Sequence, residues 1–216
     1  MNKIDNYRLM KETGVVGVIR TQSSEKLVKV ARAIREGGVC CIEVAMTTPN
    51  ALKVIEEVSD ELKDVLIGAG TVLDAETARS AILAGAQYLV SPTTDRDMIK
   101  MARRYDKIVA PGAFTPTEIM TAWEAGADIV KVFPASRLGP KFLSDVRAPL
   151  PQVSLMPTGG VSKDNAADFI RAGAEVLCVG SALIDKQAIA EGNYEKLTEN
   201  ARELIAAVER GREEEN

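Results

Sequence analysis

The chain alternates short runs rich in β-branched residues with longer amphipathic stretches, and it does so eight times. In residues 24–38, for example, the positions of Leu27, Val28, Ala31 and Ile34 follow the helical period and share one face. The 216 residues divide into 27 per unit, close to the length of a compact strand–helix repeat. The predicted strands are Val15–Arg20, Cys40–Met46, Val65–Val72, Tyr88–Pro92, Ile108–Phe114, Ile129–Pro134, Ser154–Gly160 and Val176–Leu183.

Several of these runs follow a glycine next to a small residue, as in GAQYLVSP (85–92), GADIVKVF (126–133) and GAEVLCVG (173–180). A glycine there suits a helix C-cap that leads into the next strand. Apolar strands separated by helices are typical of a parallel sheet covered on both faces. Eight units favour a closed (β/α)8 barrel, an α/β fold, with residues 1–216 as one domain. We expect a helix over 4–12 to cover the bottom of the barrel, and a frayed charged end over 209–216.

Composition excludes several classes of function. The 27 Lys and Arg residues against 31 Asp and Glu give a net charge of −4, with no basic footprint for nucleic acid or an anionic membrane. There is no apolar run of about 18 residues, and the opening MNKIDNYRLMKETG lacks the apolar stretch of an export signal. Cys40, Cys41 and Cys178 are expected to be small buried side chains in a reducing compartment. We therefore expect a cytoplasmic protein that binds neither nucleic acid nor membrane.

The chain contains no histidine, which removes the commonest general base and the commonest transition-metal ligand. Acid–base chemistry near neutral pH must then come from a carboxylate or a lysine. Three charged residues lie inside the predicted strands: Arg20, Glu43 and Lys131. Strand residues of a barrel face either the packed interior or the helix layer, and neither environment favours an unpaired charge.

These charges have two interpretations. In the structural one, Lys131 and Glu43 form a buried ion pair, or one of them lies at a wet strand end. In the functional one, Lys131 is desolvated among valines and Phe133, which makes its ammonium easier to deprotonate. The amine could then attack a ketone, and a nearby Glu43 could move the protons that imine formation and cleavage need.

Polar and glycine-rich segments also follow several predicted strands. Thr71 ends the GAGT segment at the edge where barrel active sites are built, although a hydroxyl there could equally bond local backbone. Gly159 and Gly160 end the seventh run, and Gly180 and Ser181 lie in the eighth. Loops after these two strands cradle phosphate in many barrels, whereas the alternative is a pair of tight turns.

These motifs together resemble the 2-keto-3-deoxy-6-phosphogluconate (KDPG) aldolases, class I aldolases that include 4-hydroxy-2-oxoglutarate (KHG) aldolase. The resemblance runs end to end, through VVGVIR, GGVCCIEVAMTTPNA, IGAGTV, AGAQYLVSP, PGAFTPTE, VKVFPA, PTGG and CVGSAL. It implies cleavage of KDPG to pyruvate and glyceraldehyde 3-phosphate, as in the Entner–Doudoroff pathway, and cleavage of KHG to pyruvate and glyoxylate. It further implies a homotrimer, a phosphorylated keto-deoxy sugar acid as substrate, and neither metal nor organic cofactor.

Residue roles follow from the resemblance. Lys131 would form the Schiff base and Glu43 would be the acid/base. Thr71 would contact the pyruvoyl end of the substrate, and Arg20 would bind its carboxylate. Phe133 would also bind the substrate. Some members carry an arginine soon after the glutamate, where this chain has AMTTP. The segments with Gly159, Gly160, Gly180 and Ser181 match the phosphate site.

Three other functions remain open from the sequence. The chain could act on 2-dehydro-3-deoxy-6-phosphogalactonate, which differs from KDPG in stereochemistry. It could be a phosphate-binding barrel isomerase or epimerase with Glu43 as base and no Schiff base. It could also be a barrel without activity, although buried charges would then be retained at a cost in stability.

Overall fold

The computed structural model describes residues 2–19 and 24–213, in which strands and helices alternate along the chain. Each predicted strand run contains an observed strand, and the run over 108–114 contains two, because Pro111 between them has no amide hydrogen to donate. The strands are β1 (Val15–Ile19), β2 (Cys41–Ala45), β3 (Leu66–Gly70), β4 (Tyr88–Val90), β5 (Ile108–Ala110), β6 (Gly112–Ala113), β7 (Val130–Val132), β8 (Leu155–Pro157) and β9 (Leu177–Val179).

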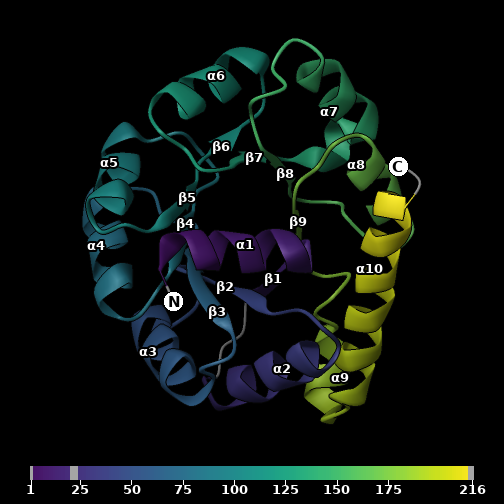
Figure 1. Ribbon diagram of the computed structural model, residues 1–216. Coiled ribbons are helices and arrows are strands. Elements are labelled where there is room, and N and C mark those ends of the chain that lie inside the picture. The colour runs from purple at the N-terminus through teal and green to yellow at the C-terminus, as the bar shows by residue number, and fades with distance from the viewer. Residues whose placement is uncertain (1, 20–23, 214–216) are drawn as a thin grey trace.

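The helices cover the strands from outside, except for the first (Figure 1). Among the described residues, none of the helices is long and apolar enough to cross a membrane. They are α1 (Lys3–Thr13), α2 (Ser24–Glu36), α3 (Ala51–Glu61), α4 (Ala75–Leu83), α5 (Arg96–Arg104), α6 (Pro116–Glu124), α7 (Gly139–Arg147), α8 (Ala166–Arg171), α9 (Lys186–Glu191) and α10 (Glu195–Glu213), with a 3-10 turn at Ala135–Arg137.

All strand pairs are parallel and fall into two sheets. The larger has the order β5-β4-β3-β2-β1-β9, and the smaller has the order β6-β7-β8. The Asp128 amide donates to the Val109 carbonyl (3.1 Å) on one side of the smaller sheet, and the Glu175 amide donates to the Leu155 carbonyl (3.0 Å) on the other. An isolated bridge also joins Thr158 to Cys178. The α/β class is thus as predicted, but the ladder is interrupted where the sequence predicted one continuous barrel.

Alternate residues of each strand pack into different apolar clusters. Val130 and Val132 of β7 lie in the outer cluster with the helices, whereas Ile129, the residue before this strand, lies in a second cluster enclosed by the strands. This alternation follows from the two-residue period of a strand. We call the second group the interior cluster: Met10, Val16, Val18, Cys41, Leu66, Tyr88, Val90, Ile108, Ala110, Ile129, Met156, Val176 and Cys178.

Helix α1 closes the amino-terminal end of the strands, as predicted, and lies across the strand layer in Figure 1. Its Met10 side chain belongs to the interior cluster, and Tyr7 and Leu9 pack against it. Two ion pairs fasten the helix, Lys3 to Asp128 at 2.8 Å and Lys11 to Glu175 at 2.9 Å. Closure of this end leaves the carboxyl ends of the strands as the open face, where barrel active sites lie.

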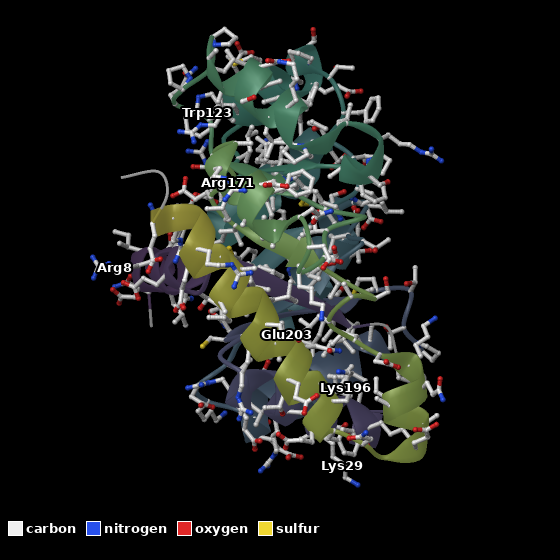
Figure 2. The ribbon with its side chains drawn as sticks, turned by 90° about the vertical axis from the view of Figure 1, so that its right-hand side faces the viewer. Arg8, Lys29, Trp123, Arg171, Lys196 and Glu203 are labelled. Carbon is white, nitrogen blue, oxygen red and sulfur yellow. The ribbon has the colours of Figure 1, made fainter. Side chains whose placement is uncertain are left out.

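The carboxyl-terminal helix α10 packs along α8 and α2, and Figure 2 shows it in yellow beside α8, on which Arg171 is labelled. The prediction of a frayed end from 209 is wrong, because α10 continues to Glu213. Gly211 lies so close to α8 that a Cβ on it would be 2.7 Å from the Ile170 Cβ. The Arg212 guanidinium donates to the Glu12 carbonyl (2.9 Å), which ties this end to α1.

Candidate active site

Lys131 and Glu43 both face the space enclosed by the strands. Lys131 follows Ile129 at the two-residue period of β7, and Glu43 follows Cys41 in β2, so each shares the face of an interior-cluster residue. Their exposed fractions are only 6% and 2%. Arg20, the third charged residue of the predicted strands, lies outside the described residues.

The Lys131 amine contacts an aromatic ring and, among the described residues, has no carboxylate beside it. Its Nζ lies 4.9 Å from the centre of the Phe133 ring. Within the part of the chain that the structure describes, no carboxylate oxygen lies within 4.0 Å of this nitrogen. The structural alternative, a Lys131–Glu43 ion pair, is therefore not what holds the amine in the interior. An amine so placed is available as a nucleophile.

Both carboxylate oxygens of Glu43 have a defined neighbour. The Cys178 thiol donates to Oε2, with 3.5 Å between sulfur and oxygen. The other oxygen lies against Gly70 of β3, where a Cβ atom would be only 1.7 Å from Oε1. The residue that pairs in register with Glu43 on β3 is Gly68, two residues before Gly70. The Glu43 side chain therefore extends along the sheet toward the carboxyl end of β3.

Cys178 is electrostatically coupled to both charged residues. Burial raises the pKa of its thiol, the Glu43 charge raises it further, and the Lys131 charge opposes the rise. The thiol therefore remains protonated and can donate. The sequence predicted only a small buried side chain here. The alternation of Val176 and Cys178 in the last strand was the available signal, but a strand period does not show which residue a side chain meets across an interior.

Tyr88 is a second polar residue of the interior cluster that the sequence did not single out. Burial raises the pKa of its phenol well above the ordinary value, with smaller contributions from Cys41, Glu43 and Cys178. Its hydroxyl is buried and has no hydrogen-bond partner among the described residues. The ring covers Gly68, where a Cβ would lie 2.3 Å from the ring carbons. The Tyr88 ring thus fills the space that the missing side chain of Gly68 leaves next to Glu43.

Thr71 directly follows β3 in a strained conformation. Its φ of 59° lies in the left-handed region, which is unusual for a β-branched residue and costs on the order of 1–3 kcal/mol. The flanking backbone is held by bonds from Met46 N to Gly70 O (2.7 Å) and from Val72 N to Val90 O (3.1 Å). No described residue bonds the Thr71 hydroxyl, so the local-turn alternative does not account for it. Such strain is found at functional sites.

The glycines after β8 lie against the segment after β7. Gly159 and Gly160 have φ values of 87° and 80°, which favour glycine. A Cβ on Gly160 would be 2.5 Å from the Ser136 Cβ, and one on Gly159 would be 3.6 Å from the Phe133 ring. These two glycines therefore share one edge of the fold with the aromatic ring that contacts Lys131.

Gly180 and Ser181 follow β9 at the same edge. A Cβ on Gly180 would meet no atom of the described residues within 4 Å, and Ser181 is exposed. The Gly180 carbonyl accepts from the Leu183 and Ile184 amides at 3.0 and 2.9 Å, which shapes this segment as a turn. The parallel strands β8 and β9 meet at the Thr158–Cys178 bridge, so both turns lie on the open face.

A cavity of about 490 Å3 opens beside Phe133 at the carboxyl ends of β4, β6 and β7. It combines aromatic rings, hydroxyls and one guanidinium, a mixture suited to a polar ligand. Its lining residues are Pro92, Thr93, Thr94, Arg96, Gly112, Ala113, Phe114, Glu118, Thr121 and Phe133.

Comparison with known proteins gives consistent matches over most of the chain. The 2-dehydro-3-deoxy-phosphogluconate aldolase of Treponema pallidum is 34% identical over 203 residues, 94% of this chain and 97% of that protein. The KHG/KDPG aldolase of Escherichia coli is 35% identical over 193 residues, 88% and 90% of the two chains. The KDPG aldolase of Legionella pneumophila, solved with pyruvate as a covalent carbinolamine, has a TM-score of 0.85 at 27% identity, covering 92% and 97%.

The parallel α/β fold, the buried amine and these relatives define an aldolase, an enzyme that makes or breaks carbon–carbon bonds. The family model described as KDPG and KHG aldolase matches residues 6–200. The chain belongs to the KDPG and KHG aldolase family.

Proposed function

We propose that this protein is a class I aldolase that cleaves KDPG to pyruvate and glyceraldehyde 3-phosphate, and KHG to pyruvate and glyoxylate. The observation that carries the proposal is the Lys131 amine, 6% exposed, against the Phe133 ring and without an ion-pair partner among the described residues. The names of the relatives and the carbinolamine captured in the Legionella enzyme support it.

The reaction begins when the neutral Lys131 amine adds to the ketone carbon C2 of the substrate. Protonated Glu43 gives a proton to the hydroxyl of the resulting carbinolamine, which leaves as water, so that a protonated imine remains as an electron sink and Glu43 becomes a carboxylate. Glu43 removes the proton of the C4 hydroxyl, the C3–C4 bond breaks, and its electron pair passes into the imine to form an enamine. The aldehyde leaves, and Glu43 returns a proton to C3. Water then hydrolyses the protonated imine to release pyruvate and the free amine, and the Glu43 carboxylate takes up the proton that this step releases.

The remaining assignments concern substrate binding. Thr71 and Phe133 would contact the pyruvoyl end, since both lie where the strands β3 and β7 end. Backbone N–H groups of Gly159, Gly160 and Gly180 and the hydroxyl of Ser181 would bind the phosphate. Arg20 would bind the carboxylate with its planar guanidinium. Bound phosphate would fix the substrate relative to Lys131, so substrates without it should react more slowly.

We further propose that the two sheets close into one eight-stranded (β/α)8 barrel, in which β5 and β6 form a single bent strand around Pro111. Hydrogen bonds on both sides of the smaller sheet support this closure. Residues 1–216 would then form one domain. The homotrimer and the cytoplasmic location are proposals that rest on the family resemblance.

Borohydride trapping tests the reaction. Incubation with pyruvate and borohydride should add a reduced pyruvoyl group to Lys131, located by peptide mass spectrometry, and Lys131→Met should remain unlabelled. An unlabelled wild-type protein would favour the isomerase or epimerase without a Schiff base. Pyruvate release from KDPG, followed with a coupled dehydrogenase, separates an active enzyme from an inactive barrel.

The phosphogalactonate isomer is a second candidate substrate. The 2-dehydro-3-deoxy-6-phosphogalactonate aldolase of Escherichia coli is 31% identical over 195 residues, close to the identity of the phosphogluconate enzymes. A structure described as native KDPGal has a TM-score of 0.86 at 30% identity, covering 92% of this chain and 96% of that one. Comparison of kcat/KM for KDPG, its galactonate isomer and KHG under identical conditions decides the preferred substrate.

A further inference from the structure

We propose that Gly70 and Cys178 are positioning residues for Glu43, which together hold its carboxylate in the orientation that proton transfer requires. The inference rests on the proposed function, because it concerns how the acid/base of that reaction is held. It starts from the two oxygens of Glu43, each of which meets a different strand: one lies against β3 and the other against β9.

Gly70 provides space that no other residue could provide. An added Cβ would lie 1.7 Å from Oε1 and 2.3 Å from the Cδ of Glu43. The carboxylate would therefore have to move by about 1 Å or more to reach an ordinary contact distance. A displacement of this size at a reacting group costs roughly a hundredfold in rate. The backbone at position 70 does not require glycine, since this residue is part of the regular ladder with β2.

Cys178 fixes the other oxygen. It belongs to β9, which the strands β1 and β2 separate from β3 in the larger sheet, and its thiol donates to Oε2 of Glu43 at 3.5 Å. The thiol is 1% exposed and Glu43 is 2% exposed, so water does not compete freely for this bond. The Lys131 charge also acts on the thiol and lowers its pKa, against the effect of Glu43. The Cys178 thiol binds one oxygen of the carboxylate, and the missing side chain of Gly70 leaves room for the other. Together they favour one orientation of the Glu43 carboxylate.

A set of four variants tests the proposal with purified full-length protein. Cys178→Ala removes the donor, and Cys178→Ser keeps one. Cys41→Ala is the matched control, because Cys41 is an equally buried thiol of the interior cluster that makes no bond to Glu43. Gly70→Ala adds the Cβ. Each is assayed for kcat and KM with KDPG and for the final yield of pyruvate trapped on Lys131 by borohydride.

We expect Cys178→Ala to lower kcat roughly fivefold, as expected for loss of one hydrogen bond, with KM and trapping yield unchanged. Cys178→Ser should recover most of that loss, and Cys41→Ala should stay within about twofold of wild type. Gly70→Ala should lower kcat roughly a hundredfold while Lys131 is still trapped. A fall in kcat without a change in trapping separates a displaced proton carrier from a damaged amine or a loosened core.

Three outcomes would overturn the proposal. The first is a wild-type kcat for both Cys178→Ala and Gly70→Ala. The second is an equal loss for Cys178→Ala and Cys41→Ala, which would show a general effect of a cavity. The third is a kcat for Cys178→Ser that is as low as that of Cys178→Ala. If Gly70→Ala does not fold, this comparison of the two Cys178 variants decides by itself. Failure of the proposed function looks different, because the wild-type protein itself would then neither trap pyruvate nor release it from KDPG.

Discussion

Replacement of Lys131 by methionine should make the protein more stable while it abolishes aldol cleavage. The two side chains have similar length and shape, so the packing around β7 is largely kept. The change removes a buried amine that has no carboxylate within 4.0 Å among the described residues. Burial of a polar group without a hydrogen bond costs about 1–3 kcal/mol in mutational data.

Against this gain stands the contact of the Lys131 Nζ with the Phe133 ring at 4.9 Å. A cation over an aromatic face contributes about 0.5–2 kcal/mol, and a methionine sulfur near the same ring recovers about 0.3–1.5 kcal/mol. The net expectation is an increase of about 1–2 kcal/mol in the free energy of unfolding at neutral pH. In a chain of 216 residues this raises the melting temperature by roughly 3–6 °C.

Urea denaturation, followed by circular dichroism, measures the change, with an unchanged m-value as evidence that the two proteins unfold alike. Lys53→Met is the matched control, because Lys53 is 72% exposed on α3 and its replacement should change stability by less than about 0.5 kcal/mol. A loss of about 3 kcal/mol or more in Lys131→Met is the signature of a broken buried ion pair. That result would refute the reasoning, since it would require a charged partner for Lys131.

Three further predictions concern other groups. Glu43→Gln should slow KDPG cleavage roughly a hundredfold or more in steady-state assays, while pyruvate can still be trapped on Lys131, and wild-type turnover would remove Glu43 from the mechanism. Partial burial alone would raise the pKa of Glu175, but the Lys11 ammonium, the Ser154 hydroxyl and the Arg147 charge hold it below the ordinary value. The Glu175 carboxylate therefore stabilises the folded protein by about 1 kcal/mol above the unfolded pKa near 4.5. This stabilisation is lost as the pH falls through the lower pKa of the folded state. The melting temperatures of wild type and Glu175→Gln should therefore differ at pH 7 and converge near pH 3. Gly160→Ala, whose Cβ would meet Ser136, should raise KM for KDPG roughly tenfold and leave KM for unphosphorylated KHG nearly unchanged, and equal effects on both would remove Gly160 from the phosphate site.

Sequence patterns were sufficient for the order of elements and singled out two of the charges that are buried. The eight apolar runs predicted the positions of the strands, because burial on both faces of a parallel sheet requires nearly continuous apolar residues. Lys131 and Glu43 were exceptions within such runs, and both are buried. Local patterns were less informative at the ends. The charged residues from 209 indicated fraying, but Gly211 and Arg212 hold the helix through contacts with α8 and α1 that are distant in the sequence.

The sequence by itself determined a parallel α/β chain with one lysine and one glutamate inside two apolar strands, because the strand period and the cost of burying charge are local properties. Only the tertiary structure decided that these two residues do not pair, that a thiol from the last strand bonds Glu43, and that Gly70 makes room for its carboxylate. Those facts depend on which strands face one another and at what level, and a one-dimensional pattern carries no information about distances across an interior.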